Sequence, residues 1–144
     1  MTEAPTIRVL VVDDDARVRN ALSRLLSDVS GIQGLSVDGD QAMRLVKWGS
    51  AVCDVAVVDM PSTSSAASLL VPRLAAVIPV VVVSLSPMVR RAALAAGAGH
   101  FVEKGGDPDS LIAAIRAMAP AALTLGTRDR PASDRALTCS TRRL

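Results

Sequence analysis

Short, almost wholly apolar runs recur along this chain and alternate with segments of helical periodicity. The three clearest runs are rich in valine and occupy residues 7–12, 52–58 and 80–83. A strand has such a continuous apolar sequence when both faces of its sheet are covered, because neither side of the strand then contacts water. Residues 100–103 form a further candidate, and the weaker run at 32–37 suits a strand at a sheet edge. The sequence therefore predicts five strands of a parallel sheet.

Helix starts can be read between these runs. Asp15 is placed to cap a first helix, because its carboxylate can accept a hydrogen bond from an unpaired backbone N–H group. The pairs Ser86-Pro87 and Asp107-Pro108 each put a capping residue before a proline at the first helical position. We expect the fourth and fifth helices to begin at these two pairs.

Two further helices have less regular patterns. A short second helix is expected over residues 40–48, where Gly49 ends it. Residues 64–76 predict a third helix that contains Pro72. Because proline lacks the N–H group and its ring clashes with the preceding turn, we expect Pro72 to break or kink this helix.

The alternation of strands and helices predicts an α/β fold with right-handed crossovers. Specifically, we expect a flavodoxin-like, doubly wound, five-stranded parallel sheet of order 2-1-3-4-5 with helices on both faces. The pattern ends near residue 120, so we expect one domain at 1–120 and a basic, disordered tail or linker at 121–144.

Charge and composition narrow the classes of function. Of a net charge of +2, the tail contributes +3 through five arginines and two aspartates, which leaves the body at −1. With only Trp48 and Phe101 as aromatic residues and no basic stripe, the body is not expected to bind DNA directly. No apolar run approaches the roughly 20 residues that span a bilayer. Cys53 and Cys139 match no metal or disulfide spacing, so we expect a cytoplasmic protein.

Polar side chains stand at the ends of four of the predicted strands. Asp13 and Asp14 follow the first strand, Asp59 ends the third, Ser84 follows the fourth and Lys104 follows the fifth. In a doubly wound sheet, ligands bind outside the carboxyl ends of the strands, where the strand order reverses. For the order 2-1-3-4-5 this point lies between the first and third strands. We therefore expect Asp13, Asp14 and Asp59 to meet there.

Three carboxylates in one place repel one another unless a cation neutralises them. Mg²⁺ suits the site because it binds a few protein oxygens together with water and phosphate. Lys104 would add a second positive charge and Ser84 a hydroxyl donor. Such a site fits phosphoryl transfer to an aspartate, for which Asp59 is the candidate nucleophile.

Five segments in order resemble the receiver domains of bacterial two-component response regulators. The resemblance spans about residues 7–118, and the last segment is most similar to the LuxR/NarL-type subfamily, although no helix-turn-helix domain follows it. The segments are VLVVDDDARVR, CDVAVVDMP, PVVVVS, AGAGHFVEK and DPDSLIAAIRAM.

The resemblance implies roles for the residues at the strand ends. Asp59 would accept a phosphoryl group from a sensor histidine kinase, in a reaction that needs Lys104. Asp14 and Asp59 would bind Mg²⁺ directly and Asp13 mainly through water, with the backbone carbonyl of Pro61 as a further ligand. The chain would catalyse only its own phosphorylation and dephosphorylation.

The resemblance also implies an output. Ser84 and Phe101 match the hydroxyl and the aromatic residue that switch the family's conformation. A downstream protein would bind the face formed by the fourth helix, fifth strand and fifth helix, and a homodimer is possible. Neither DNA nor a membrane is an expected partner.

Departures from the family pattern keep two alternatives open. Asp59 and Ser84 lie only 25 residues apart, and Leu85 stands where the family usually has a small residue. A degenerate receiver that binds partners without phosphorylation is one alternative. The other is a small phosphatase of the haloacid-dehalogenase type, with Asp13 as nucleophile and Asp15 as acid/base, in which Asp59 would have no role.

Overall fold

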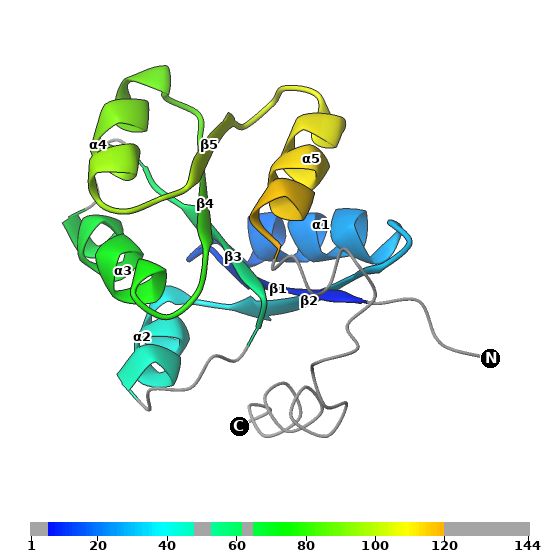
Figure 1. The fold of residues 1–144 in the computed structure, drawn as a ribbon, viewed down its shortest axis with the longest axis horizontal. Coiled ribbons are helices and arrows are strands. Elements are labelled where there is room, and N and C mark those ends of the chain that lie inside the picture. The colour runs from blue at the N-terminus through cyan, green and yellow to red at the C-terminus, as the bar shows by residue number, and fades with distance from the viewer. Residues whose placement is uncertain (1–5, 48–52, 62–64, 120–144) are drawn as a thin grey trace.

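Figure 1 shows a central twisted sheet with helices on either side of it. The computed structural model describes residues 6–47, 53–61 and 65–119, except for the side chains of 65–68. The strands are β1 (Ile7–Val12), β2 (Ile32–Val37), β3 (Val55–Asp59), β4 (Val80–Ser84) and β5 (His100–Glu103). The helices are α1 (Ala16–Ser27), α2 (Gly39–Lys47), α3 (Ser65–Ala75), α4 (Arg90–Ala95) and α5 (Pro108–Met118), with a 3₁₀ turn at Pro87–Val89 before α4.

All strands are parallel, in the order β2-β1-β3-β4-β5, which confirms the predicted sheet. Val9 pairs with Val55 between β1 and β3, and Ala56 pairs with Val80 between β3 and β4. The start of the third strand was predicted too early: Cys53 and Asp54 form a bend, and the strand begins at Val55.

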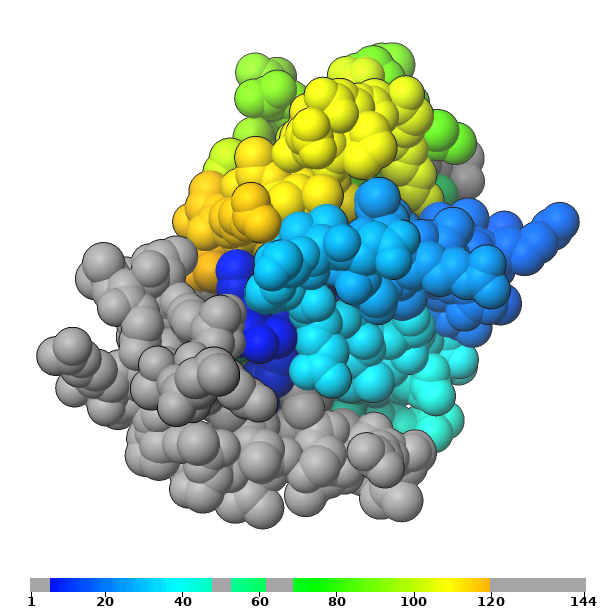
Figure 2. Space-filling view, turned by 90° about the vertical axis from the view of Figure 1, so that its right-hand side faces the viewer, coloured from blue at the N-terminus to red at the C-terminus, as the bar shows by residue number. Residues whose placement is uncertain are grey.

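The two faces of the sheet are covered by different helices. On β1, Leu10 and Val12 join the core under α2, α3 and α4, whereas Val9 and Val11 join the core under α1 and α5. Because alternate side chains of one strand point to opposite faces, both sets must be apolar. This requirement explains the near-continuous valine runs. Figure 2 shows α5 and α1 side by side on one face.

Two of the predicted helix caps are confirmed by their hydrogen bonds, whereas the third, Ser86, stands at the N-cap position before Pro87 without a cap hydrogen bond. Asp15 Oδ1 accepts from the Arg17 N–H group at 2.9 Å, and the Asp107 side chain likewise accepts from the N–H group two residues later. The Ser86 side chain makes no cap hydrogen bond; its own N–H group donates to Ser84 Oγ at 3.2 Å. The short connection after β4 turns as a 3₁₀ helix first, so α4 starts at Arg90 rather than at residue 87.

Of the two outcomes expected at Pro72, the break in the third helix is wrong. Helix α3 runs on to Ala75, and the Ala76 N–H group donates to the Pro72 carbonyl at 3.2 Å. The buried side chains of Val71 and Leu74 hold the two sides of the proline against the sheet, while Pro72 itself is exposed. Burial of such side chains stabilises a protein by about 1.5–3 kcal/mol each, which offsets the local cost of the proline.

Some predictions fall outside the described residues. These are the end of the second helix at Trp48 and Gly49, and the tail at 121–144. Within the described part of the chain, no helix is long and apolar enough to cross a membrane.

Candidate functional site

A cleft opens at the carboxyl ends of β1 and β3, where the strand order reverses. It has a volume of about 280 Å³. Asp13 and Asp14 enter it from the end of β1 and Asp59 enters from the end of β3, while Asp15, Asp40 and Pro61 also line it. The structure therefore brings together the three carboxylates that the sequence placed at this point. Asp40, in the first turn of α2, was not predicted, because its position at the cleft depends on how α2 packs.

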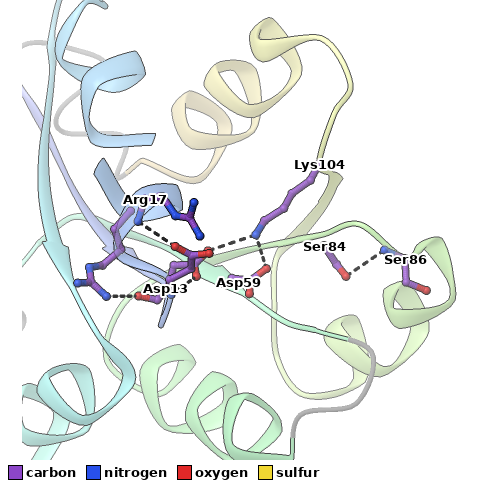
Figure 3. Close-up of polar contacts among 8 residues, drawn as sticks. Asp13, Arg17, Asp59, Ser84, Ser86 and Lys104 are labelled. Carbon is purple, nitrogen blue, oxygen red and sulfur yellow. Dashed lines mark hydrogen bonds and ion pairs between the residues drawn. The ribbon is translucent and has the colours of Figure 1, made fainter. Parts of the chain in front are cut away.

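Lys104 lies between two of these carboxylates, as Figure 3 shows. Its Nζ atom is 2.6 Å from Asp59 Oδ1 and 3.2 Å from Asp13 Oδ2. The backbone N–H group of Lys104 donates to the Ser84 carbonyl at 2.8 Å, which anchors the residue to the neighbouring strand. A cation thus already neutralises part of the acidic cleft.

Two further carboxylate oxygens of the cleft accept hydrogen bonds from backbone N–H groups, and an arginine holds the backbone at Asp13. Asp13 Oδ1 accepts from the Asp15 N–H group at 2.9 Å, and the Asp13 carbonyl accepts from Arg19 Nη1 at 2.7 Å. Asp14 Oδ1 accepts from the Gly39 N–H group at 3.1 Å. A Cβ atom on residue 39 would lie 3.2 Å from the same oxygen, so glycine permits this close approach. Sequence reasoning missed Arg19 and Gly39, since neither belongs to a recognisable motif.

Burial is the largest single influence on the pKa of Asp59 and of Lys104, but it sets the direction of the shift only for Asp59. Loss of solvation raises the pKa of Asp59, and repulsion by Asp13 and Asp14 adds to this effect, so together they outweigh the attraction of Lys104. Burial by itself lowers the pKa of Lys104, but the hydrogen bonds and charges of Asp59 and Asp13 outweigh it and raise that pKa. Lys104 therefore stays protonated beside a carboxylate that water solvates poorly.

The site fits Mg²⁺ in the type of its ligands more than in their arrangement. Carboxylate and carbonyl oxygens are the ligands that Mg²⁺ prefers. In the part of the chain that the structure describes, however, no group of three His, Cys, Asp or Glu side chains is placed to hold a metal ion. The reason is visible in the contacts, because Lys104 lies between Asp13 and Asp59 while Asp14 bonds to the start of α2.

Neither of the two predicted switch residues lines the cleft. Ser84 is buried at 1% exposure, and its Oγ atom accepts from Ser86, away from Asp59 (Figure 3). Phe101 on β5 is half-buried and packs against the core under α2, α3 and α4. Leu85 does not line the cleft; its side chain is 78% exposed and extends into solvent beside the end of β4.

This fold and cleft place the chain in a known class. Residues 9–116 match the model of the response regulator receiver domain. The chain belongs to this family, whose members are the receivers of two-component signalling. Among curated proteins, none matches the chain.

Solved structures agree with this assignment. A response regulator receiver protein from Burkholderia phymatum is 30% identical, with 80% of this chain and 99% of that chain covered and a TM-score of 0.64. A Francisella receiver domain is 24% identical, with coverages of 78% and 96% and a TM-score of 0.65. The signal receiver domain assigned to NarL of Mycobacterium tuberculosis is 26% identical, with coverages of 78% and 94% and a TM-score of 0.62. NarL is one of several similar receivers, so closeness to its subfamily stays a prediction.

Proposed function

We propose that Asp59 accepts a phosphoryl group from the phosphohistidine of a sensor histidine kinase, in a Mg²⁺-dependent reaction in the cytoplasm. The observation that carries this proposal is the ammonium of Lys104, 2.6 Å from Asp59 in an acidic cleft at the switch point of the sheet. A cation beside a poorly solvated carboxylate is the arrangement that a charged, in-line transfer needs.

The chemistry follows from the placement of the side chains. An oxygen of Asp59 forms the bond to phosphorus as the N–P bond of the donor breaks and its electron pair returns to the imidazole. Lys104 would neutralise charge on the transferred oxygens. Asp13, Asp14, Asp59 and the Pro61 carbonyl would hold Mg²⁺, which supplies further positive charge to those oxygens when bound.

The phosphoryl group would then act as a switch. It adds about −1.5 to −2 charge and new acceptor oxygens beside Ser84 and Lys104. Among the described residues, the Ser84 hydroxyl has one hydrogen bond to give up, at 3.2 Å from the Ser86 N–H group. Its hydroxyl can therefore turn to the phosphoryl group, and Phe101 can pack further inward. The face of α4, β5 and α5 would repack and bind a downstream protein or a second copy of the chain.

Intact-mass analysis after incubation with acetyl phosphate and Mg²⁺ tests the proposal. We expect one added phosphoryl group on the wild type, labile at alkaline pH, and none on Asp59→Asn. Asp40→Asn is the matched control, because Asp40 lines the same cleft and should leave labelling intact. Labelling of Asp59→Asn would show that the acceptor is another residue.

A second candidate is a degenerate receiver that binds its partner without phosphorylation. The observation that favours it is the lack of a ready three-ligand metal group among the described residues. If neither the wild type nor Leu85→Ala is labelled, this candidate replaces the first. The phosphatase alternative has less support, because the Asp15 carboxylate caps α1 and Asp13 is held under Lys104. Turnover of a generic phosphate ester would favour it.

We also propose that residues 1–120 are sufficient for this function. Helix α5 ends at Met118, and the following residues lack apolar periodicity. Deletion of residues 121–144 should leave the melting temperature and the response to Mg²⁺ unchanged. Unfolding or aggregation of the shortened protein would place the boundary further along the chain.

A further inference from the structure

Helices α2 and α3 lie next to each other on the side of the sheet opposite α1 and α5 (Figure 1). An open groove of about 350 Å³ runs between them. Three cationic residues line it: Arg44 and Lys47 in the last turn of α2, and Arg73 on α3. Met43 and Val46 form the apolar part of its lining. We call this surface the α2–α3 groove.

The two helices of the α2–α3 groove carry one acidic residue, Asp40, which lies one turn before Arg44 on α2. No Asp or Glu lines the groove. The ion pairs among the described residues involve Arg8 and Lys104 instead. All three cationic side chains are exposed, so their mutual repulsion is screened by solvent and salt. Three positive charges, with no acidic residue in the lining itself, therefore face the solvent together.

Apolar side chains distinguish this groove from an ordinary solvated charged surface. Leu69 is 63% exposed and lies one turn before Arg73, so the two share a face of α3. On α2, half-buried Met43 and Val46 alternate with the exposed cations. The groove thus offers apolar contacts from Met43 and Val46 beside three positive charges, and Leu69 adds an exposed apolar side chain outside its lining.

From this combination we propose that the α2–α3 groove docks an acidic amphipathic helix of a protein partner. A groove between two helices accepts a convex ridge, and a helix with leucines on one stripe and carboxylates beside it matches both features. A flat anionic membrane would gain only about 1 kcal/mol from each of three cations. Nucleic acid would gain few phosphate contacts and no aromatic stacking from these lining residues.

This docking surface goes beyond the proposed function, because it does not require a phosphoryl group on Asp59. It also differs from the face of α4, β5 and α5, since α2 and α3 contribute no residue to that face. If Asp59 is not phosphorylated, the docking proposal still stands. If the groove does not bind the peptide, the proposed phosphorylation of Asp59 still stands.

The test is a fluorescence-anisotropy titration of the full, unphosphorylated chain into a labelled helical peptide. The peptide carries leucines at helical spacing with glutamates on both sides, and a matched peptide has glutamine in place of each glutamate. We expect the glutamine peptide to bind at least about tenfold more weakly, and binding of the glutamate peptide to fall as salt is raised.

Charge reversal then locates the contact. The double variant Arg44→Glu/Arg73→Glu should bind the glutamate peptide at least about tenfold more weakly, a loss of about 1.4 kcal/mol or more. Arg116→Glu is the matched control, because Arg116 is also exposed in the last turn of a helix but lies on α5. Circular dichroism should show that both variants stay folded, and the milder Arg44→Gln/Arg73→Gln should give an intermediate loss.

Several outcomes would overturn the inference. One is a glutamate peptide that does not bind, or that binds the double variant as well as the wild type. Another is an equal loss with Arg116→Glu, which would indicate a non-specific charge effect. A third is tighter binding to phosphatidylserine vesicles or duplex DNA than to the peptide, lost on the same reversal, which would assign the groove to those ligands.

Discussion

Lys104→Met removes the ammonium that lies between Asp59 and Asp13 and keeps a side chain of similar length. In the wild type that ammonium is 2.6 Å from one carboxylate and 3.2 Å from the other. The side chains of Lys104, Asp59 and Asp13 are 21%, 18% and 4% exposed, so the cluster is intermediate between a surface pair and a buried one. Surface pairs contribute about 1 kcal/mol or less, and breaking a buried pair costs about 3–5 kcal/mol.

We therefore expect Lys104→Met to lower the free energy of unfolding by about 2 kcal/mol in the absence of metal. For a domain of this size, that corresponds to a fall in melting temperature of about 8 °C. Because the ammonium and Mg²⁺ would neutralise the same carboxylates, removal of the ammonium should raise the affinity for Mg²⁺. We expect a gain of about tenfold, or about 1.4 kcal/mol.

The assay is thermal unfolding in EDTA and across Mg²⁺ from the micromolar to the millimolar range, with affinity taken from the shift. Lys47→Met is the matched control, since Lys47 is exposed on α2 and does not line the cleft. It should unfold and bind Mg²⁺ as the wild type does. If Mg²⁺ stabilises Lys104→Met no more than the wild type, the ammonium does not compete with the metal and the account of the cleft is wrong.

Three further predictions concern stability. The pKa of Asp59 is raised above its usual 3.8, so ionisation of this carboxyl group lowers the stability of the native state. Without metal at neutral pH, Asp59→Asn should therefore melt at a higher temperature than the wild type. This difference should disappear below pH about 4, where Asp59 is protonated in both the folded and the unfolded state. Gly97 has φ +115°, and a Cβ atom there would lie 3.1 Å from the methyl group of Ala75. Gly97→Ala should therefore lower the free energy of unfolding by about 2 kcal/mol. The loss should be smaller for Gly105→Ala, where φ is +85° and the space is open. Asp54 accepts a hydrogen bond from the Arg8 N–H group at 2.9 Å and forms an ion pair with the Arg8 guanidinium. In urea unfolding, Asp54→Ala should therefore lower the free energy of unfolding by about 3–5 kcal/mol, whereas replacement of an exposed aspartate should change it little.

Local patterns in the sequence were enough to predict most of the fold. The valine runs of β1, β3 and β4 identify strands that are covered on both sides. Asp15 and Asp107 cap α1 and α5 at the positions that the sequence predicted. These features depend on residues close together in the chain. A break at Pro72 was wrongly expected, because burial of its neighbours against the sheet outweighs the preference of proline itself.

The candidate site divides in the same way. By itself the sequence determined which polar residues stand at the strand ends, since Asp13, Asp14, Asp59, Ser84 and Lys104 each follow or end an apolar run. Only the tertiary structure decided what these residues do to one another. Lys104 meets Asp13 across 91 positions of sequence and occupies the space between two carboxylates, while Ser84 turns away to its own loop. Such contacts depend on the packing of whole strands and helices, whose relative placement no local pattern encodes.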